Sequence, residues 1–302
     1  SILFEAAVAS GTPIISTLMR DLSYSNINSI RAIINGTSNF ILSEMEEKNT
    51  EFIEALELAQ KLGYAEPDPT NDIEGFDARY KLSILSSLAF KTEVEYPKLH
   101  VEGISKIDSI DFQYARELGY SIKLLAIAEK IESGILARVH PTMIDLNNPL
   151  AKISGAMNAI EIQEKLLGTV IIQGPGAGPS PTSSGILSDL IHVLKTKQNS
   201  QSVPTLINNL QINDIKTLKS RFYLRFIVHD KAGVLSKMSN ILGEENISIA
   251  SVIQKENTNL EEKYADLVFM TYKSSQSSID KAIQKITKLD VVDQLKSLIR
   301  VE

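Results

Sequence analysis

The C-terminal part of the chain carries the pattern that most restricts its fold. Apolar runs rich in β-branched residues predict four strands, at 221–228, 247–254, 264–272 and 291–300. Helical periodicity predicts two helices, over 232–244 and 277–289. The order strand, helix, strand, strand, helix, strand is that of a ferredoxin-like βαββαβ domain. A polar stretch at 196–220, with Gln, Asn and Ser around Pro204, predicts a linker before this domain.

Length and composition limit what the chain can do. Its 302 residues are enough for two domains, and 43% apolar with 23% charged residues is typical of a globular protein. A net charge of −6 argues against a nucleic-acid partner, which needs a basic surface. Cysteine is absent, which excludes disulfides and thiolate chemistry. No apolar run reaches the ~18 residues of a membrane span, so no membrane partner is expected.

The first two thirds of the chain alternate between both kinds of element, which predicts an α/β (α+β) class with a mixed sheet. Further strands are expected at 2–9, 27–34, 121–129, 135–139 and 166–173. Further helices are expected at 13–22, from about Phe40 to Met45, and at 50–62, 73–90, 111–118 and 184–194. Lys123 lies inside one of these strands, and we expect it at an edge or facing solvent, without a role.

A loop that leads into a helix, from Gly63 to Lys81, carries the densest chemistry. Two prolines and Gly63 keep its first half out of regular structure. On the helix, Asp77 and Lys81 project near the middle of an apolar arc, where burial of charge costs several kcal/mol unless the charges are paired or serve chemistry. Glu66 and Asp72 precede them, so the group suggests a site for a small substrate with an amine. The alternative is an ordinary i,i+4 pair of roughly 0.3 kcal/mol.

This stretch closely resembles the signature of homoserine dehydrogenases. The matching residues are Gly-Tyr-Ala-Glu-Pro-Asp-Pro-Thr from Gly63, then Asp72, Gly75, Asp77 and Lys81. The resemblance extends to Phe4-Glu-Ala-Ala-Val-Ala-Ser-Gly-Thr-Pro-Ile-Ile, to Ile34-Asn-Gly-Thr-Ser-Asn-Phe-Ile-Leu and to Gly174-Pro-Gly-Ala-Gly. The family is longer, and because Ser1 opens directly onto an apolar run, we expect most of an N-terminal nucleotide-binding domain to be missing.

The resemblance implies reversible NAD(P)-dependent conversion of L-homoserine into L-aspartate 4-semialdehyde, in the cytoplasm, on the route to threonine, methionine and isoleucine. Lys81 would be the general acid/base, and Asp77 would orient it or the reacting hydroxyl. Glu66 would bind the substrate ammonium, Tyr64 would shape the pocket and Asp72 would support the network. Without a dinucleotide fingerprint, the chain alone is expected to bind NADP or NAD poorly and to be inactive.

Two glycine turns complete the implied enzyme site. Gly36 and Thr37 would hold the substrate carboxylate, although Thr37 or Ser38 as a simple helix cap is the alternative. The spacing of Gly174, Gly176 and Gly178 is only weak evidence of a phosphate-binding turn. The resemblance implies that these three glycines lie on the side of the site where the cofactor binds.

The turn near the start of the chain, over residues 5–12, is implied to be a cation site. There the carbonyl groups of Glu5, Val8, Ser10 and Thr12 would hold a monovalent cation such as sodium; the alternative is a plain Gly-Pro turn.

The C-terminal domain resembles an ACT domain, through Asp230-Lys-Ala-Gly-Val-Leu and Asn246-Ile-Ser-Ile. An amino-acid effector, with threonine expected, would meet a group of residues around the first strand-to-helix turn: Asp230, Ala232, Gly233, Val234, Leu235 and Asn246. The alternative is a structural dimerisation module. A homo-oligomer, dimer or tetramer, is expected.

Five segments follow from the resemblance. They are a nucleotide-binding remnant (1–12), a catalytic and dimerisation domain (13–165), a return segment to the nucleotide-binding domain (166–195), the linker (196–220) and the ACT domain (221–302). Two other functions remain open: an amino-acid-sensing or oligomerisation fragment without activity, and another amino-acid dehydrogenase that would have to explain the same 66–81 run.

Overall fold

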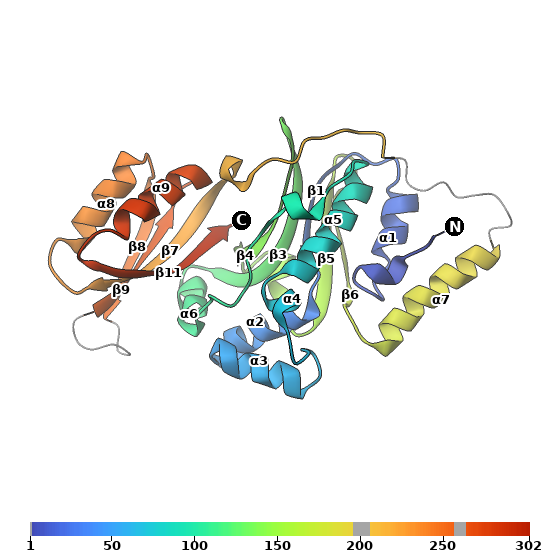
Figure 1. Cartoon of the computed structure of the whole chain (residues 1–302), viewed down its shortest axis with the longest axis horizontal. Helices are drawn as coiled ribbons and strands as arrows, with labels where there is room; N and C mark the ends of the chain where they lie inside the picture. The colour runs from blue at the N-terminus through green and yellow to red at the C-terminus, as the bar shows by residue number, and fades with distance from the viewer. Residues whose placement is uncertain (1, 196–205, 257–263) are drawn as a thin grey trace.

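The computed structural model describes residues 2–195, 206–256 and 264–302. The molecule is elongated, with α8 and α9 at one end and α7 at the other (Figure 1). One 11-stranded sheet runs through it, in the order β6-β5-β1-β3-β4-β11-β7-β9-β8. The predicted mixed α/β class is therefore confirmed, and the two domains share a single sheet.

The central strands are antiparallel to one another. They are β1 (Ile27–Ile33), β3 (Tyr120–Ile131), β4 (Gly134–Asp145), β5 (Met157–Glu164) and β6 (Gly168–Pro175). A tight turn joins β3 to β4, and the two pair without interruption from Tyr120↔Asp145 to Ile131↔Gly134. The sequence indicated four of these strands and assigned nothing to β5. A short strand, β2 (His100–Val101), pairs parallel to β4.

Lys123 corrects a sequence expectation. It lies on β3 with 1% of its surface exposed, and its Nζ is 3.4 Å from Glu46 Oε2. It therefore faces the core beneath α2 (Gly36–Lys48) and is neither an edge nor a solvent-facing residue. Burial lowers the pKa of Lys123, and the nearby Glu46 carboxylate opposes that shift.

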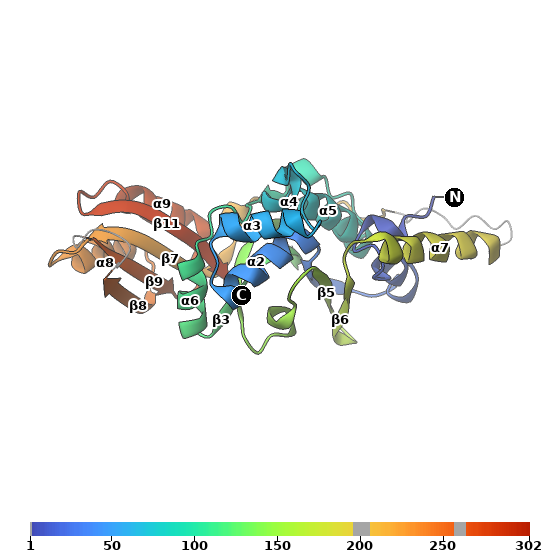
Figure 2. The same ribbon diagram turned by 90° about the horizontal axis from the view of Figure 1, so that it is seen from below.

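The helices of the central domain pack on one face of the sheet (Figures 1 and 2). They are α2, α3 (Phe52–Lys61), α4 (Thr70–Ile73), α5 (Phe76–Phe90) and α6 (Ser109–Glu117). The single helix expected over 73–90 is wrong at its start, because Gly75 breaks it with φ +77. A Cβ at Gly75 would lie 3.1 Å from Val101 Cγ2, so glycine suits both the conformation and the packing.

The strand expected at 2–9 is also wrong. The segment forms a 3₁₀ turn, η1 (Glu5–Ala7), followed by α1 (Ile14–Ser16) and a π-helical turn, η2 (Thr17–Asp21). The buried Glu5 carboxylate accepts hydrogen bonds from Ile15 N at 2.9 Å and Ser16 N at 2.7 Å. An extended strand would leave this buried carboxylate without donors, whereas the turn places it at the start of α1.

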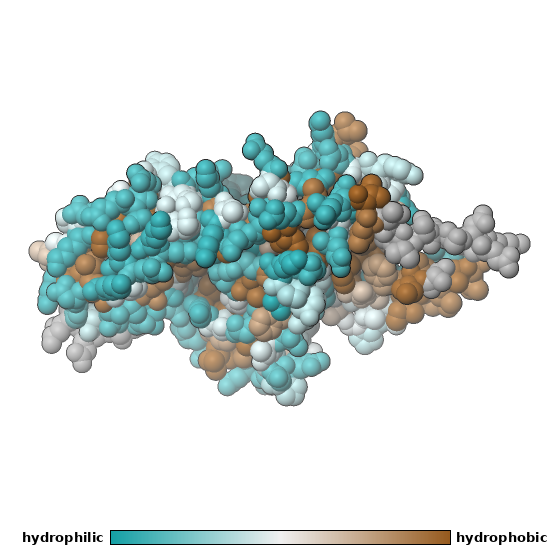
Figure 3. All heavy atoms as spheres, turned by 45° about the horizontal axis from the view of Figure 1, so that its top comes forward, coloured by the Kyte–Doolittle hydropathy of each residue, from teal (hydrophilic) through white to brown (hydrophobic). Residues whose placement is uncertain are grey.

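The far end of the molecule is formed by α7 (Pro179–Lys195), which begins earlier than expected. Five of its apolar residues are exposed over about half of their surface: Ile186, Leu187, Leu190, Ile191 and Val193. Hydrophobic residues gather at this end in the space-filling view (Figure 3). None of the helices in the described residues is long and apolar enough to cross a bilayer.

The C-terminal domain has the expected element order. It comprises β7 (Lys219–His229), α8 (Val234–Glu244), β8 (Ile249–Glu256), β9 (Tyr264–Thr271), β10 (Ser274–Ser275), α9 (Gln276–Ile286) and β11 (Val292–Val301). The strands lie in the order β11-β7-β9-β8 and enclose a separate apolar core.

Of the expected linker, 196–205 lies outside the described residues. The next residues are bound to the central domain, with Asn208 N donating to Lys91 O and Ile135 N donating to Gln211 O.

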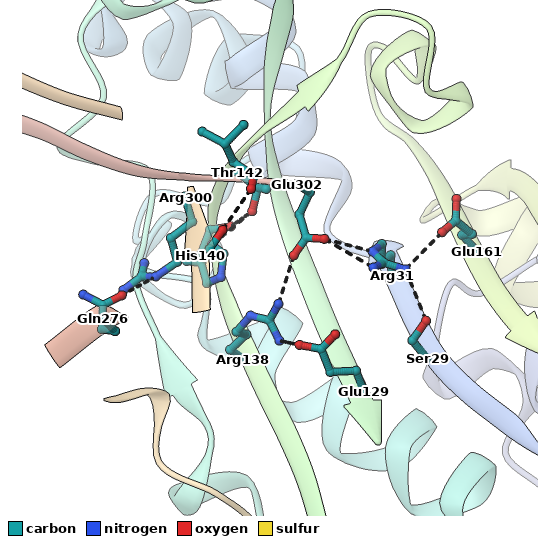
Figure 4. A network of polar contacts seen from close by, with 12 residues as sticks. Ser29, Arg31, Glu129, Arg138, His140, Thr142, Glu161, Gln276, Arg300 and Glu302 are labelled. Atoms are coloured by element: carbon teal, nitrogen blue, oxygen red, sulfur yellow. Dashed lines mark hydrogen bonds and ion pairs between the residues drawn. The ribbon is translucent and has the colours of Figure 1, made fainter. Parts of the chain in front are cut away.

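The two domains meet along a seam between β4 and β11, which pair in parallel through Arg300↔Thr142 and Val301↔Met143. Beside the seam, Glu302 accepts a hydrogen bond from Arg138 at 2.9 Å and two from Arg31 at 3.3 Å (Figure 4). Ion pairs therefore continue the contact that the two strands begin. Single-turn 3₁₀ segments complete the fold, at η3 (Tyr96–Lys98), η4 (Pro149–Lys152) and η5 (Ile215–Thr217).

Candidate active site

Lys81 and Asp77 lie on the first two turns of α5 and form a direct pair. Lys81 Nζ is 2.7 Å from Asp77 Oδ2 and donates a second hydrogen bond to the carbonyl of Ile34 at 3.2 Å. The two side chains are 22% and 28% exposed, so they are neither buried in the core nor free in water. An ammonium has three donors, and two are in use here, so one N–H remains for a third oxygen.

Asn35 organises the carboxylates around this pair. It precedes α2, and its amide nitrogen donates to Asp72 Oδ1 at 2.7 Å and to Asp77 Oδ2 at 2.8 Å. Its amide oxygen accepts from Ser38 N at 2.8 Å, which caps α2. One buried amide therefore fixes both carboxylates and starts the helix. Capping by Thr37 or Ser38 was the alternative to carboxylate binding, but Asn35 provides the cap.

The start of α2 also offers free donors. Gly36 and Thr37 occupy its first two positions, whose N–H groups have no partner within the helix or elsewhere in the described chain. The Thr37 hydroxyl donates to the carbonyl of Tyr64 at 2.6 Å, and the Tyr64 ring packs 4.7 Å from that of Phe40. These contacts attach the loop after α3 to the start of α2.

Glu66 is the predicted site residue that stands apart from the others. Its side chain is exposed and makes no hydrogen bond with the residues that the structure describes. Its backbone carbonyl accepts from Gln60 Nε2 at 3.1 Å, which holds the loop to α3. The structure thus joins Asp72, Asp77 and Lys81 in one network and leaves Glu66 outside it.

The glycine turn between β6 and α7 has the expected strand-turn-helix form. A Cβ at Gly174 would lie 2.6 Å from Thr12 Oγ1, and one at Gly176 would lie 2.3 Å from the side-chain amide of Asn158. Glycine is therefore required here by packing within the chain. Pro179 and Pro181 have no N–H, so the first turn of α7 is poor in donors for a phosphate.

Two buried side chains at this turn have unpaired polar atoms. Thr12 Oγ1 and both side-chain polar atoms of Asn158 have no hydrogen-bond partner in the described part of the chain. Buried polar groups are nearly always paired, so these atoms suggest a polar partner that reaches the turn from outside the described residues. The sequence indicated Thr12 only for its backbone carbonyl and did not indicate Asn158.

The turn proposed for a cation has an unusual backbone. Ala9 and Ser10 both adopt positive φ, at +54 and +38. The Thr12 carbonyl already accepts from Ile14 N at 2.7 Å, but a carbonyl oxygen has a second lone pair. Glu5, by contrast, uses its side chain for α1, which leaves only its backbone for any further ligand.

In the C-terminal domain, the turn before α8 is open. Gly233 has φ +90, and the side chain of Asp230 is exposed. Asn246 follows the other end of α8. Because α8 has 11 residues and a helix rises ~1.5 Å per residue, the ends are about 16 Å apart. The expectation that Asn246 lies near this turn is therefore wrong within one chain; a second copy would be needed to bring the two together.

Comparison with known proteins identifies the family. Residues 13–191 match the family model described as homoserine dehydrogenase, and residues 222–291 match the ACT domain. The homoserine dehydrogenase of Neisseria gonorrhoeae is 42% identical over 99% of this chain and 70% of its own length. That of Pseudomonas aeruginosa is 41% identical over 100% of the chain and 71% of its own length. The chain belongs to the homoserine dehydrogenase family.

Solved homoserine dehydrogenases share the fold. The crystal structure of the enzyme from Thiobacillus denitrificans superposes with a TM-score of 0.91 at 40% identity, over 99% of this chain and 69% of that one. A hyperthermophilic archaeal homoserine dehydrogenase, solved in complex with NADPH, is 34% identical over 70% of this chain and 57% of its own, with a TM-score of 0.54. The chain spans about 70% of the length of its homoserine dehydrogenase relatives.

Proposed function

We propose that this homoserine dehydrogenase interconverts L-homoserine and L-aspartate 4-semialdehyde at the start of α5. The observation that carries the proposal is the Lys81–Asp77 pair, tied to Asp72 through the amide of Asn35. A network of this kind holds a proton donor in one orientation beside two negative charges. That arrangement suits a small substrate with an alcohol or aldehyde oxygen and an ammonium group.

Lys81 moves the proton. Two of its three N–H donors are directed at Asp77 and at the Ile34 carbonyl, so the third is available to the substrate oxygen. In the reducing direction Lys81 gives a proton to the aldehyde oxygen, and in the oxidising direction it takes the hydroxyl proton. Asp77 orients Lys81 and is itself held by Asn35. Asp72 completes the network through the same amide.

The two ends of the substrate meet different elements. The N–H groups of Gly36 and Thr37, at the positive end of the α2 dipole, suit its carboxylate. The ammonium suits an acidic side chain, and we assign it to Glu66, which lies on the loop that Tyr64 attaches to α2. Because Glu66 is exposed, its role requires the loop to close over the bound substrate.

We assign the cofactor to the side of the molecule formed by β6 and α7. NADP or NAD, when bound, supplies the redox chemistry. Thr12 and Asn158 have unpaired polar atoms at the turn that holds Gly174, Gly176 and Gly178. These atoms suit an uncharged polar group of the cofactor better than its phosphates. The exposed apolar face of α7 suits the return segment's contact with a nucleotide-binding domain.

Four finer assignments accompany this proposal. The carbonyl groups of Glu5, Val8, Ser10 and Thr12 would hold a sodium ion. A threonine-like effector would bind the turn at Asp230 and residues 232–235, with Asn246 supplied by a second copy. This arrangement makes the active form a dimer or a tetramer. The enzyme would act in the cytoplasm.

The test is steady-state kinetics of homoserine oxidation, followed by nicotinamide absorbance, in the enzyme that carries this chain. Lys81→Ala should lower kcat by about 100-fold or more, because it removes the proton carrier. Glu66→Gln should act mainly on KM for homoserine. Lys98→Ala is the matched control, because it removes an exposed lysine whose ion-pair partner among the described residues is Glu95. A kcat within a few-fold of the parent for Lys81→Ala would refute the proton-transfer role.

A further inference from the structure

A cleft of about 490 Å³ lies between the two domains. One wall is the β11 segment 295–298 of the ACT domain. The other is formed by the segment 101–107 together with Glu74 and Phe76, which lie directly before the catalytic part of α5. The cleft shares no residue with the Lys81 network or with the turn before α8.

Ion pairs made by two buried arginines hold both flanks of the cleft in place. Arg300 of β11 is 2% exposed and donates to both carboxylate oxygens of Glu102, at 2.8 and 2.9 Å. Its third nitrogen, Nε, donates to Gln276 Oε1 at 2.9 Å (Figure 4). Burial opposes the ionisation of Glu102, but hydrogen bonds from His100 and Arg300 outweigh it and lower the pKa of Glu102. This flank is a charged clamp across the domain seam.

The opposite flank is a second clamp. Arg225 of β7 donates to Asp111 Oδ1 at 2.7 Å, and Asp111, on α6, is fully buried. Ser297, which lines the cleft, donates to the other oxygen of Asp111. Because buried charges move only at a large energetic cost, the cleft is a preformed cavity.

The polar groups that face the cleft form a mixed set. The side chain of Glu74 makes no hydrogen bond or ion pair with other described residues, and neither Lys106 nor Lys296 has an ion-pair partner among them. The backbone N–H groups of Ser105 and Lys106 lie in one turn, and they too have no partner in the described chain. One acidic group and a cluster of cationic and amide donors are therefore available in a single cavity.

Most of the other residues that line the cleft are apolar. Phe76, Val101 and Pro141 contribute from the catalytic domain, and Leu295 and Leu298 from β11. The set thus offers a carboxylate for an ammonium, lysines and amides for a carboxylate, and apolar surface for a short side chain. Glu74 and Glu102 would repel a phosphorylated ligand. We propose that this cleft binds a zwitterionic α-amino acid with a short apolar side chain, at a site separate from the effector turn before α8.

The position of the cleft connects it to the active site. Ile104 N donates to the carbonyl of Ile73 at 2.8 Å, and Gly103 packs so closely that a Cβ would lie 2.3 Å from that same carbonyl. Ile73 separates Asp72 from Glu74, and Phe76 precedes Asp77. A ligand held by Glu74 therefore contacts the backbone that carries both active-site carboxylates.

The test is isothermal titration of this chain with L-valine, L-isoleucine and L-threonine. Glu74→Gln and Lys296→Gln should each weaken binding of the best ligand by about tenfold or more, because each removes a charged partner. Glu95→Gln and Lys98→Gln, a surface pair outside the cleft, are matched controls and should leave the Kd unchanged. N-acetyl-L-isoleucine and L-isoleucinamide, which lack the ammonium or the carboxylate, should bind at least tenfold more weakly than L-isoleucine.

Hydrogen exchange of the unsubstituted chain provides a measurement that needs no variant. The best ligand should slow exchange at residues 101–107 and 295–298. The proposal is overturned if none of the three amino acids binds. It is equally overturned if protection appears only at 231–246 or near Lys81, or if the cleft variants keep the parent Kd.

Discussion

Asn35 allows the active-site network to be tested apart from the helix that it begins. Its amide nitrogen supports Asp72 and Asp77, and its amide oxygen caps α2. Asn35→Ser keeps an oxygen that can cap the helix but loses the amide donor, whereas Asn35→Ala loses both. The difference between the two variants therefore measures the cap, and the serine variant measures the support of the carboxylates.

The magnitudes follow from the contacts. Hydrogen bonds to charged groups contribute about 1.5–3 kcal/mol each. Because Asp77 is partly exposed and also paired with Lys81, we take the lower end for both bonds. Asn35→Ser should then reduce the free energy of unfolding by about 3 kcal/mol. Asn35→Ala should lose about 1 kcal/mol more, the usual value of a cap.

Unfolding in urea, followed by tyrosine fluorescence, gives these differences, since the chain has 9 Tyr and no Trp. Asn148→Ser is the matched control, because Asn148 caps a 3₁₀ turn through Leu150 N and supports no carboxylate. The same Asn35→Ser variant should lower kcat, because Asp77 is less firmly oriented. If Asn35→Ser loses no more stability than Asn148→Ser, Asn35 is only a helix cap and the network argument fails.

Three further predictions concern buried groups. Arg225→Met should lower the free energy of unfolding by about 3–5 kcal/mol at pH 7.5. The difference from the parent should shrink as the pH falls, because Asp111, left without its arginine, can then take a proton. A difference that does not change with pH would contradict this. Burial lowers the pKa of His140 below its usual 6.5, so the unfolded state binds more protons than the folded state below that pH. The free energy of unfolding should therefore fall, as the pH is lowered below 6.5, by up to about 1.4 kcal/mol per pH unit. His140→Gln should reduce this slope, as measured by urea unfolding at pH 5.5 and 7. Gly176→Ala should lower the Tm because its Cβ would meet the amide of Asn158, and adding Asn158→Ala should restore part of the loss; no restoration would show that the strain lies elsewhere.

Local pattern predicted the elements whose burial is regular. The apolar run in β3 and the order of elements in the ACT domain are periodic signals, and both are confirmed. The missed strand, β5, mixes Asn158, Glu161 and Gln163 with its apolar residues. It is buried because it lies between β1 and β6. Pairing across the sheet determines that strand, and a single stretch of sequence does not contain the information.

The same distinction applies to the active site. Asp77 and Lys81 are four residues apart, so helical spacing alone indicated their pairing. Asn35 is 42 residues from Asp77 in the sequence, and its type and position indicated only a turn. Glu5 was assigned to a strand because its neighbours are apolar, whereas its carboxylate pairs with donors on α1. Lys123 was assigned to solvent because lysine is rarely buried, whereas Glu46 on α2 supplies its counter-charge.

The domain boundary shows why contacts distant in sequence matter for function. A polar linker ahead of 221 suggested two independent units, yet Arg300 binds Glu102, 198 residues earlier, and Arg225 binds Asp111, 114 residues earlier. Glu102 and Asp111 lie on the segments that flank Gly103, which packs against Ile73 beside the active-site carboxylates. Displacing β11 would therefore break buried ion pairs or move this backbone. The contacts of Arg300 with Glu102 and of Gly103 with Ile73 therefore link β11 of the ACT domain to the backbone beside Asp72 and Asp77 without a break.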